Sequence, residues 1–578
     1  MDELENIARN LALRNAVEHN GRANAGPVLG QLMAADPEMR SRAKEVAAII
    51  GQIISEVNAM APADQIRELN EADPESILNL ESRRNERTDE LPPLEDAEGG
   101  VVMRFAPGPS GPLHLGHTRA VILNDEYVKR YGGKLIIRFE DTNPDKIDPD
   151  SYESILADLD WMGIDYHETA IQSDRFDLYE EWAGRLIELG RAYVCSCDVE
   201  SWRGLKEKGK PCPHRELHSE LQMKEWTKML DGTYQANAAS LVVKTDLNHK
   251  NPAVRDFVAM RINETPHPRT GRKYRVYPLY NFSVAVDDHF MKCTHVLRGK
   301  DHLNNTIRQK YIYRFLGWEL PYFHHYGWVS IKDVLLKTST IKEGILGGEY
   351  SGWDDMRLGT LQTIARRGIK PEAIREYWKE VGTKPVDVQF SWENLFAYNK
   401  SAVEKEAKRY FFAREPAKLN IQGIDRLTGK APLLPDHKES GYRITSLHSD
   451  GGFICILVDR QDAVEMSERL ADNHCVKIRL KDLCNVEVTG LDDDVFTARY
   501  TGTELNWLRE RARIIHWVPS DPLKNLDCTV LKPDGTSESG KVEAHVRESH
   551  GELVQFERYG FVSVKVVGER VEACFAHK

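Results

Sequence analysis

The segment RFAPGPSGPLHLGHTRA, residues Arg104–Ala120, decides the fold. The apolar run that leads into it predicts a strand over Val101–Ala106, and the Gly- and Pro-rich turn that follows lets the backbone approach a ligand closely. His114 and His117 then lie at the start of a helix expected over His117–Tyr131, where free N–H groups attract phosphate. Imidazoles there can donate hydrogen bonds to phosphoryl oxygens. The HxGH pattern by itself is equally compatible with an ordinary turn between a strand and a helix.

The strand–helix alternation continues on the C-terminal side. KLIIRF over Lys134–Phe139 predicts a second strand, and a helix is expected through Leu156, Leu159 and Met162. Strand–helix–strand order with Gly-rich turns favours parallel strands and a nucleotide-binding α/β layout. A similar alternation resumes at Asp287–Trp318, so we expect one sheet interrupted by an insertion at about 193–275.

The two flanks have a different character. Apolar positions over about 1–60 recur at helical spacing, and the charge-rich stretch Pro62–Gly100 suggests a surface linker or a hairpin. From about residue 400, short β-branched segments separated by turns predict barrels or sandwiches.

Composition narrows the class of protein. The 578 residues are enough for several domains, and no apolar run is long enough to predict a membrane span. The acidic, amphipathic N-terminus does not resemble a secretory signal, so we expect a cytoplasmic protein. Nine cysteines do not suggest a disulfide scaffold, and a net charge of −12 does not decide whether a local surface binds nucleic acid.

The chain resembles the class I glutamyl- and glutaminyl-tRNA synthetases. HLGH stands where that family has its HIGH motif, and RFEDTNP over Arg138–Pro144 is similar to the end of its second strand. Tyr277–Thr306 is similar to the segment that lines the family's amino-acid pocket, and Glu349–Ile374 to the segment after its second catalytic loop. The resemblance spans about 100–575, and the helical head looks like the extension of archaeal glutamyl enzymes.

The resemblance implies a Rossmann-like α/β catalytic core with an N-terminal helical extension and C-terminal all-β anticodon-binding barrels. The expected divisions are the helical extension and linker (1–99), the first catalytic half (100–192), an acceptor-stem-binding insertion (193–275), the second catalytic half (276–345), a helical connective domain (346–400) and the β-barrel domain (401–578).

The implied reaction is ATP-dependent adenylation of L-glutamate and transfer to the terminal adenosine of tRNA(Glu). By resemblance, His114 and His117 face the phosphates of ATP, Gly116 leaves room for the adenine ring, and Mg²⁺ accompanies the nucleotide. The family's second catalytic loop corresponds to Val334–Gly344, which departs from the usual pattern because Thr340 stands where many relatives place a lysine. The candidates there are Lys337, Ser339 and Lys342, and a charged surface loop is the alternative.

Glutamate needs a buried cation for its side chain and an anion for its ammonium group. Arg104, Tyr280 and Arg298 map onto the side-chain pocket and Glu140 onto the α-amino partner, and Ala106 and Gly108 belong to the same candidate substrate site. Glutaminyl enzymes place an uncharged residue where this chain has Arg298, and a guanidinium suits a carboxylate better than an amide. The alternative is that Arg298 belongs to a structural ion pair, with Glu140 or Asp287.

The insertion carries a candidate structural zinc site. CSC at 195–197 and CPH at 212–214 place two pairs of ligands at the ends of one loop, which suits tetrahedral Zn²⁺. Two turns with incidental thiols remain the alternative. The predicted ligands are Cys195, Cys197, Cys212 and His214.

The sequence predicts the residues that contact tRNA less clearly than it predicts the catalytic site. The β-rich third is expected to read the anticodon, with Trp507, Arg509, Arg511, Arg513 and Trp517 as weak candidates that are equally compatible with core and solvated positions. Whether the enzyme also accepts tRNA(Gln) is left open, and a monomer is the default expectation. Three other hypotheses stand beside this one: a glutaminyl-tRNA synthetase, a small-molecule nucleotidyltransferase, and a degenerate synthetase kept as a binding module.

Overall fold

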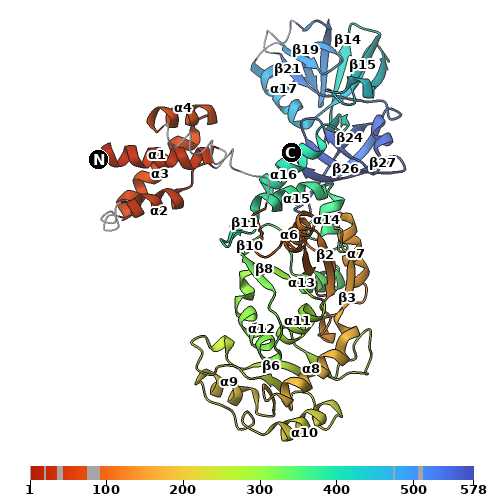
Figure 1. The fold of residues 1–578 in the computed structure, drawn as a ribbon. Coiled ribbons are helices and arrows are strands. Elements are labelled where there is room, and N and C mark those ends of the chain that lie inside the picture. Colours follow the sequence, from red (N-terminus) through yellow and green to blue (C-terminus); the bar gives the residue numbers. More distant parts are fainter. Residues whose placement is uncertain (1, 19–20, 36–42, 74–90, 473–474, 506–511) are drawn as a thin grey trace. The chain divides into compact units, whose positions relative to one another are not determined.

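The computed structural model describes residues 2–18, 21–35, 43–73, 91–472, 475–505 and 512–578. The chain divides into two compact units, Met1–Leu91 and Pro92–Lys578. Figure 1 shows the ribbon, with the N-terminal helices in red and the C-terminal strands in blue. Among the described residues, no helix has both the length and the apolar character needed to span a lipid bilayer.

The first unit is helical, as expected. Its helices are α1 (Asp2–Glu18), α2 (Ala25–Ala35), α3 (Ala43–Ala59) and α4 (Pro62–Ala72). Ala8, Ala12 and Ala16 recur every four residues on one face of α1 and are fully buried, so that small side chains let the helices pack closely. The predicted linker over Pro62–Gly100 is wrong for its first part, because Pro62 begins α4 at a position where a missing N–H costs nothing; residues 74–90 lie outside the described residues.

A parallel sheet forms the centre of the second unit. Strand β1 (Val101–Phe105) pairs in parallel with β2 (Gly133–Phe139), which pairs in parallel with β3 (Glu168–Ile171). After the insertion, β8 (His295–Gly299) pairs in parallel with β9 (Tyr322–Tyr326). Strand β8 lies beside β1, because the N–H of Thr294 donates to the carbonyl of Val102. The two halves therefore meet at β1 and β8, where the strand order reverses, although ladder hydrogen bonds place β1–β2–β3 and β8–β9 in separate sheets. The sequence predicted that the sheet resumes after the insertion, but not which strands meet.

Helices connect these strands. The first half has α6 (Leu115–Tyr131), α7 (Ser151–Trp161) and α8 (Phe176–Glu188), and the second has α11 (Tyr280–Phe290) and α12 (Leu303–Leu316). Helix α6 begins two residues before the predicted start at His117. The side chain of His114 accepts a hydrogen bond from the N–H of Gly116 and so acts as the N-cap.

The insertion is an antiparallel sheet with two helices. Its strands are β4 (Ala192–Cys195), β5 (Ser240–Val243), β6 (Phe257–Ile262) and β7 (Val276–Pro278), and its helices are α9 (Val199–Glu207) and α10 (Ser219–Leu230). The leucine, valine and methionine side chains of this sheet pack against α8, so the insertion shares one core with the catalytic helices.

Short elements follow the second half of the sheet. Strand β10 (Val329–Ser330) pairs with β11 (Val388–Gln389), and the helices are α13 (Thr338–Leu346), α14 (Leu361–Arg366), α15 (Pro371–Val381) and α16 (Trp392–Val403). The predicted second catalytic loop, Val334–Gly344, is a loop only as far as Lys337. From Thr338 onward it is helix α13, so Lys337 is the N-cap residue of a helix.

Among its described residues, the part from Arg409 onward is all β apart from α17 (Arg460–Asp472) and short 3₁₀ turns, as predicted. One seven-stranded sheet holds β12 (Arg409–Tyr410), β13 (Phe412–Arg414), β23 (Asn525–Leu531), β24 (Ser537–Glu543), β25 (Leu553–Phe556), β26 (Gly560–Val567) and β27 (Arg570–His577). The other holds β14 (Ala417–Gln422), β17 (Phe453–Val458), β18 (Val476–Leu480), β19 (Cys484–Asp492), β20 (Val495–Gly502), β21 (Arg513–Ile515) and β22 (Val518–Pro519), and β15 (Arg426–Pro432) pairs with β16 (Tyr442–His448).

Two of the candidate anticodon residues turn out to be structural. Trp517 is 4% exposed and belongs to the core of the sheet that contains β14. Arg513 donates to the buried carboxylate of Asp462 at 2.9 Å. The core interpretation is therefore confirmed for Trp517, whereas Arg513 is half-buried in an ion pair. Trp507, Arg509 and Arg511 lie outside the described residues.

The close approach of β1 and β2 predicts a difference between two adjacent glycines. Both have positive φ, but a Cβ on Gly133 would lie 2.0 Å from the carbonyl oxygen of Val101, whereas a Cβ on Gly132 meets no atom within 4 Å. We expect Gly132→Ala to lower the free energy of unfolding by about 1–2 kcal/mol and Gly133→Ala by about 2 kcal/mol more. Urea denaturation followed by circular dichroism measures both, and equal losses would contradict the steric explanation.

Candidate active site

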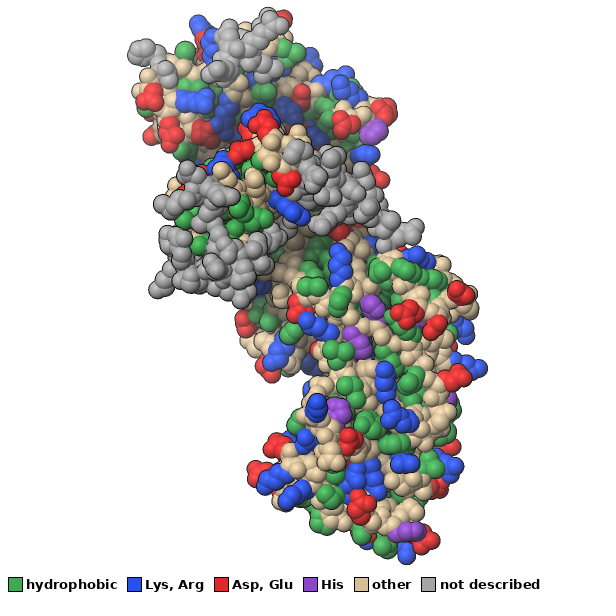
Figure 2. Space-filling model, turned by 60° about the vertical axis from the view of Figure 1, so that its left-hand side comes forward, with side chains coloured by type: hydrophobic (Ala, Val, Ile, Leu, Met, Phe, Trp, Pro, Cys, Tyr) green, Lys and Arg blue, Asp and Glu red, His purple; other side chains and the backbone are tan. Residues whose placement is uncertain are grey.

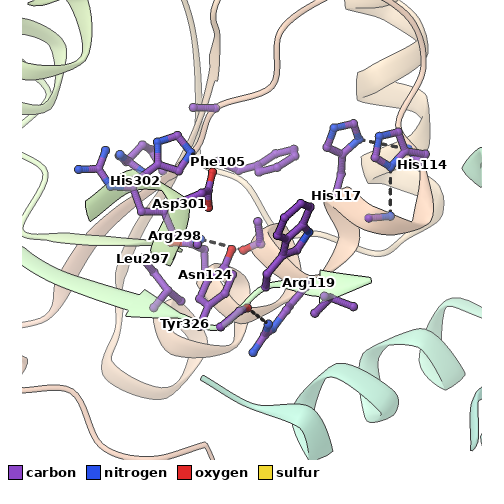
Figure 3. A pocket seen from close by; sticks show the side chains of 18 of the residues that line it. Phe105, His114, His117, Arg119, Asn124, Leu297, Arg298, Asp301, His302 and Tyr326 are labelled. Atoms are coloured by element: carbon purple, nitrogen blue, oxygen red, sulfur yellow. Dashed lines mark hydrogen bonds and ion pairs between the residues drawn. The ribbon is translucent and has the colours of Figure 1, made fainter. Parts of the chain in front are cut away.

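A cavity of about 490 Å³ opens at the carboxyl ends of β1 and β8. Ligands of open parallel sheets bind at this kind of edge, where the strand order reverses. Figure 3 shows His114 and His117 on one side of the cavity and Arg298, Asp301 and His302 on the other. The further lining residues are Arg104, Phe105, Ala106, Gly116, Arg119, Ala120, Asn124, Glu140, Tyr280, Leu297, Gly299, Tyr326, Gly327, Trp328, Val329, Ile331 and Leu336.

The two histidines form one stacked unit at the start of α6. Their ring centroids are 3.7 Å apart. The N–H of Gly116 donates to Nδ1 of His114 at 3.1 Å, and the N–H of His114 donates to Nδ1 of His117 at 3.2 Å. Since both Nδ1 atoms accept, each neutral ring carries its proton on Nε2. Gly116 makes the stack possible, because a Cβ there would lie 2.9 Å from the His114 ring.

Both imidazoles are neutral at pH 7. Burial lowers the pKa of His114 to about 4. Burial, together with His114, also lowers the pKa of His117 well below its usual value. The pair therefore presents Nε2–H donors rather than cations, and neutral donors at a helix N-terminus can stabilise phosphoryl oxygens without a change of protonation.

A buried network of ions forms the floor beneath the cavity, and two of its members, Arg104 and Glu140, line the cavity itself. Asp288 of α11 accepts from Arg104 of β1 at 3.0 Å and from Arg138 of β2 at 2.6 Å. Burial alone would raise the pKa of Asp288, but these two guanidinium groups hold it below its usual value. Glu140 pairs with Arg138 at 3.0 Å, and Arg175 pairs with Asp287 at 2.7 Å. The network joins both halves of the sheet.

Arg298 differs from these arginines, because its partners are neutral. It is 6% exposed and donates to the hydroxyl of Tyr280 at 3.1 Å, to the hydroxyl of Thr306 at 2.6 Å and to the amide oxygen of Gln309 at 2.8 Å. Burial lowers its pKa, and its Nε has no hydrogen-bond partner among the residues that the structure describes. Within the described parts of the chain, no carboxylate lies at ion-pair distance from it. The structural ion pair with Glu140 or Asp287 is therefore wrong.

The cavity brings together most of the predicted site. Four predicted residues do not line it: Gly108, Lys337, Ser339 and Lys342. Lys337 and Ser339 are exposed at the start of α13, and Lys342 pairs with Asp148 at 2.7 Å. Glu140 does line the cavity, although its carboxylate is engaged by Arg138.

Several lining residues were not predicted. Asp301 and His302 follow Arg298 in the chain, so their place in HVLRGKDH was a usable signal. Arg119 carried none, because its role depends on distant segments: it donates to the carbonyls of Gly327 and Gly382, both at 2.7 Å.

The four predicted metal ligands meet in the insertion. One ligand atom from each of Cys195, Cys197, Cys212 and His214 lies within 4.8 Å of the others. The Sγ atoms of Cys195 and Cys212 are 3.7 Å apart, and Nδ1 of His214 lies 3.8 Å from Sγ of Cys195. With bonds of about 2.3 Å to sulfur and 2.1 Å to nitrogen, the edges of a tetrahedral zinc site are about 3.6–3.8 Å.

The family models match nearly all of the second unit. Residues 100–405 match the catalytic domain of the class I tRNA synthetases (E and Q). Residues 407–503 and 514–565 match the two models of their anti-codon binding domain. The chain belongs to the class I glutamyl- and glutaminyl-tRNA synthetases. The predicted family and its fold are thereby confirmed.

Relatives of the same length support the glutamyl branch of these synthetases. A glutamate–tRNA ligase of Methanocaldococcus jannaschii is 46% identical over 572 residues, covering 98% of this chain and 99% of that protein. One of Methanoculleus marisnigri is 45% identical over 579 residues, covering 100% of both.

A crystal structure of the glutamate-tRNA synthetase of Elizabethkingia anophelis shares 20% identity over 53% of this chain and 71% of that chain, with a TM-score of 0.38.

The lowered pKa of His114 predicts an acid-sensitive contribution to stability. The unfolded chain binds a proton near pH 6.5, but the folded ring does so only near pH 4, so stability is lost as the pH falls from about 6.5 to 4. His114→Asn keeps a capping side chain that does not titrate. We expect its free energy of unfolding to fall by about 1–2 kcal/mol less than that of the wild type between pH 7 and pH 5.

Urea denaturation at the two pH values measures this difference. The exposed His448 offers a matched control, and we expect His448→Asn to behave as the wild type. Equal losses in the wild type and in His114→Asn would show that His114 does not resist protonation in the folded protein.

Proposed function

We propose that this chain is a glutamate–tRNA ligase, which activates glutamate with ATP and transfers it to the terminal adenosine of tRNA(Glu). The observation that carries the choice of amino acid is Arg298, a buried guanidinium with only neutral partners among the described residues. An uncompensated buried charge is unfavourable by several kcal/mol, and a carboxylate of the substrate would relieve it.

The charge of the whole floor favours the same substrate. Four guanidinium groups, those of Arg104, Arg138, Arg175 and Arg298, face three carboxylates, those of Asp287, Asp288 and Glu140. The floor therefore has one surplus positive charge. Glutamate carries one net negative charge at pH 7, whereas glutamine carries none, so the balance supports glutamate over glutamine.

The roles of the other residues follow from their positions in the cavity. In adenylation the α-carboxylate of glutamate attacks the α-phosphorus of ATP, and pyrophosphate leaves; Mg²⁺ would accompany the triphosphate. His114 and His117 would donate from Nε2 to the phosphoryl oxygens as charge develops there. Glu140 would accept from the ammonium group of glutamate, next to Arg104 and Tyr280.

The lysine of the second catalytic segment would be Lys342 or Lys337. Lys337 lies at the N-terminus of α13 and is exposed, and Lys342 is held by Asp148. Neither lysine lines the cavity, but Lys337 directly follows Leu336, which does. Ser339, in the first turn of α13, would offer its hydroxyl and N–H to the pyrophosphate.

The insertion would hold a structural zinc ion. Three thiolates and one imidazole are typical of such sites, and the distances between them suit a tetrahedron. His214 turns Nδ1 toward the thiols while its Nε2 lies 3.0 Å from the hydroxyl of Ser196. Such a second hydrogen bond orients a metal-binding imidazole. A closed site of four protein ligands would cross-link the ends of the loop and would not activate water.

The β sheets and the insertion would bind the tRNA. Figure 2 shows Lys and Arg side chains, in blue, spread over the visible face of the part of the second unit that carries α9 and α10. Asp and Glu side chains, in red, lie among them. Over the whole insertion, residues 193–275, 15 Lys and Arg outnumber 10 Asp and Glu, and such a local excess attracts a polyanion in spite of the negative net charge. The proposal includes a monomeric enzyme and action in the cytoplasm, and the comparison of tRNA(Glu) with tRNA(Gln) below decides whether tRNA(Gln) is a second substrate.

Replacement of Arg298 tests the assignment of the amino acid. Arg298→Cys removes the charge that pairs with the side chain of glutamate, and we expect kcat/KM for glutamate to fall at least about 100-fold. Glutamine activation should be unchanged or higher. Aminoacylation with radiolabelled glutamate and glutamine, on purified tRNA(Glu) and tRNA(Gln), measures both amino acids and the tRNA preference. Undiminished charging of glutamate by Arg298→Cys would refute the pocket assignment.

Replacement of His117 distinguishes the hypothesis of an enzyme from that of a tRNA-binding module without catalysis. We expect His117→Ala to abolish charging while the variant still binds tRNA, because the phosphoryl oxygens lose a donor and the tRNA surface is intact. If the wild type itself charges neither amino acid on either tRNA, the chain acts as a binding module.

Zinc content tests the proposed metal site. We expect about one zinc ion per purified chain by plasma mass spectrometry, and a loss of most of it in Cys212→Ser. Cys455, which lies outside the cluster and is only half-buried, provides the control variant Cys455→Ser with unchanged zinc. A metal-free wild type whose thermal midpoint does not respond to added zinc would contradict the site.

A further inference from the structure

The cavity has an apolar rim in addition to its charged floor. Trp328, Val329, Ile331 and Leu336 line it. Trp328 is 71% exposed, although the indole is among the largest apolar surfaces that a side chain can bury. Leu336 would lie 3.8 Å from a Cβ on Gly116, so this rim reaches the loop that carries the two histidines.

The backbone beneath the exposed indole is held from several sides. The N–H of Trp328 donates to the carboxylate of Asp387 at 2.7 Å, and its carbonyl accepts from the N–H of Val388 at 2.8 Å. Lys300, just after β8, holds Asp387 by an ion pair of 2.7 Å.

The preceding residue is equally constrained. Gly327 donates its N–H to the carbonyl of Lys384 and accepts from Arg119 of α6, at 2.8 Å and 2.7 Å. A Cβ on Gly327 would lie 1.9 Å from the carbonyl oxygen of Val386, so only glycine allows the two segments to come this close. The turn at Gly327 and Trp328 is therefore held rigidly by contacts with α6, with the residue that follows β8 and with the segment 384–388.

The indole is exposed, sits on a rigid turn and lies at the mouth of a polar cavity. This arrangement suits a planar ligand that stacks on the ring. Ordering this indole on binding costs little conformational entropy, because the side chain has only two χ angles and its backbone is already fixed. A nucleobase stacked on an aromatic ring gains about 1–3 kcal/mol, and a base needs no charged partner on its face. The neutral Nε2–H donors of His114 and His117 lie in the same cavity and suit the phosphates that a nucleotide would bring.

We propose that Trp328 is a purine-binding residue, whose indole stacks on an adenine that enters this cavity. Two sources offer the same chemistry, namely the base of ATP and the terminal adenosine of tRNA. The inference rests on the proposed function for these two ligands, but it concerns a contact that can be measured without catalysis. Trp328 is thus a substrate-binding residue that neither HLGH nor the second catalytic segment contains.

Two substitutions of Trp328 test the stack. Trp328→Phe keeps an aromatic face, and Trp328→Ala removes it. With the full-length protein, we expect Trp328→Ala to weaken binding of one adenine ligand about 5- to 100-fold, measured by calorimetry with ATP–Mg²⁺ and with tRNA(Glu). Trp328→Phe should stay within about threefold of the wild type.

A matched control and a ligand without a base separate stacking from damage to the turn. Val386 is 67% exposed on the segment 384–388 that holds this turn, but it does not line the cavity, and we expect Val386→Ala to bind both ligands as the wild type does. Inorganic tripolyphosphate with Mg²⁺ carries the phosphates alone, so its affinity should be equal in the wild type and in Trp328→Ala.

The two ligands give distinct outcomes. If Trp328→Ala binds ATP more weakly but binds tRNA as the wild type does, the stack is assigned to the base of ATP. If Trp328→Ala binds intact tRNA more weakly but binds tRNA without its terminal adenosine as the wild type does, the stack is assigned to that adenosine. Three results would overturn the inference. Trp328→Ala could bind both adenine ligands as tightly as the wild type, it could lose as much affinity for tripolyphosphate as for ATP, or Val386→Ala could lose as much affinity as Trp328→Ala. A wild type that binds ATP through Trp328 but charges no glutamate would refute only the proposed function.

Discussion

The carboxylate of Asp288 is the group on which the catalytic unit depends. It accepts from Arg104 on β1 and from Arg138 on β2, and it belongs to α11, which follows the insertion in sequence. One buried anion thus joins the two halves of a sheet that the chain interrupts between them. Breaking a buried pair of this kind leaves an uncompensated charge and costs about 3–5 kcal/mol. The same contacts fix the side chain of Arg104, which lines the cavity.

The histidines of HLGH serve structure and chemistry together. Each Nδ1 accepts a backbone N–H at the start of α6, which satisfies donors that a helix end leaves free. That bond determines which nitrogen carries the proton, and burial keeps both rings neutral. A lysine or an arginine could supply charge at this place, but it could not accept a hydrogen bond from the backbone. The capping geometry therefore explains why imidazoles suit this position.

The cavity separates two kinds of recognition. Its floor is charged and is assembled from strand ends, and Arg298 there has neutral partners only, within the part of the chain that the structure describes. Its rim is apolar and is mounted on a turn that α6, β8 and the segment 384–388 hold in place. The charged floor is the basis of the proposal for glutamate, and the apolar rim is the basis of the proposal for a flat heterocycle. The imidazole donors line the same cavity, on the side opposite Arg298.

The sequence by itself determined the family, the parallel sheet, the helical head and the β-rich third, because periodicity and the motifs of Arg104–Ala120 and Tyr277–Thr306 are local signals. It also identified the four metal-ligand candidates, since their spacing is local. Only the tertiary structure decided the partners of Arg298, the burial of Trp517 and the exposure of Trp328. Those properties arise from contacts between segments far apart in the chain, as between Arg119 and Gly382. Long-range packing sets burial and charge balance, and a one-dimensional pattern does not contain it.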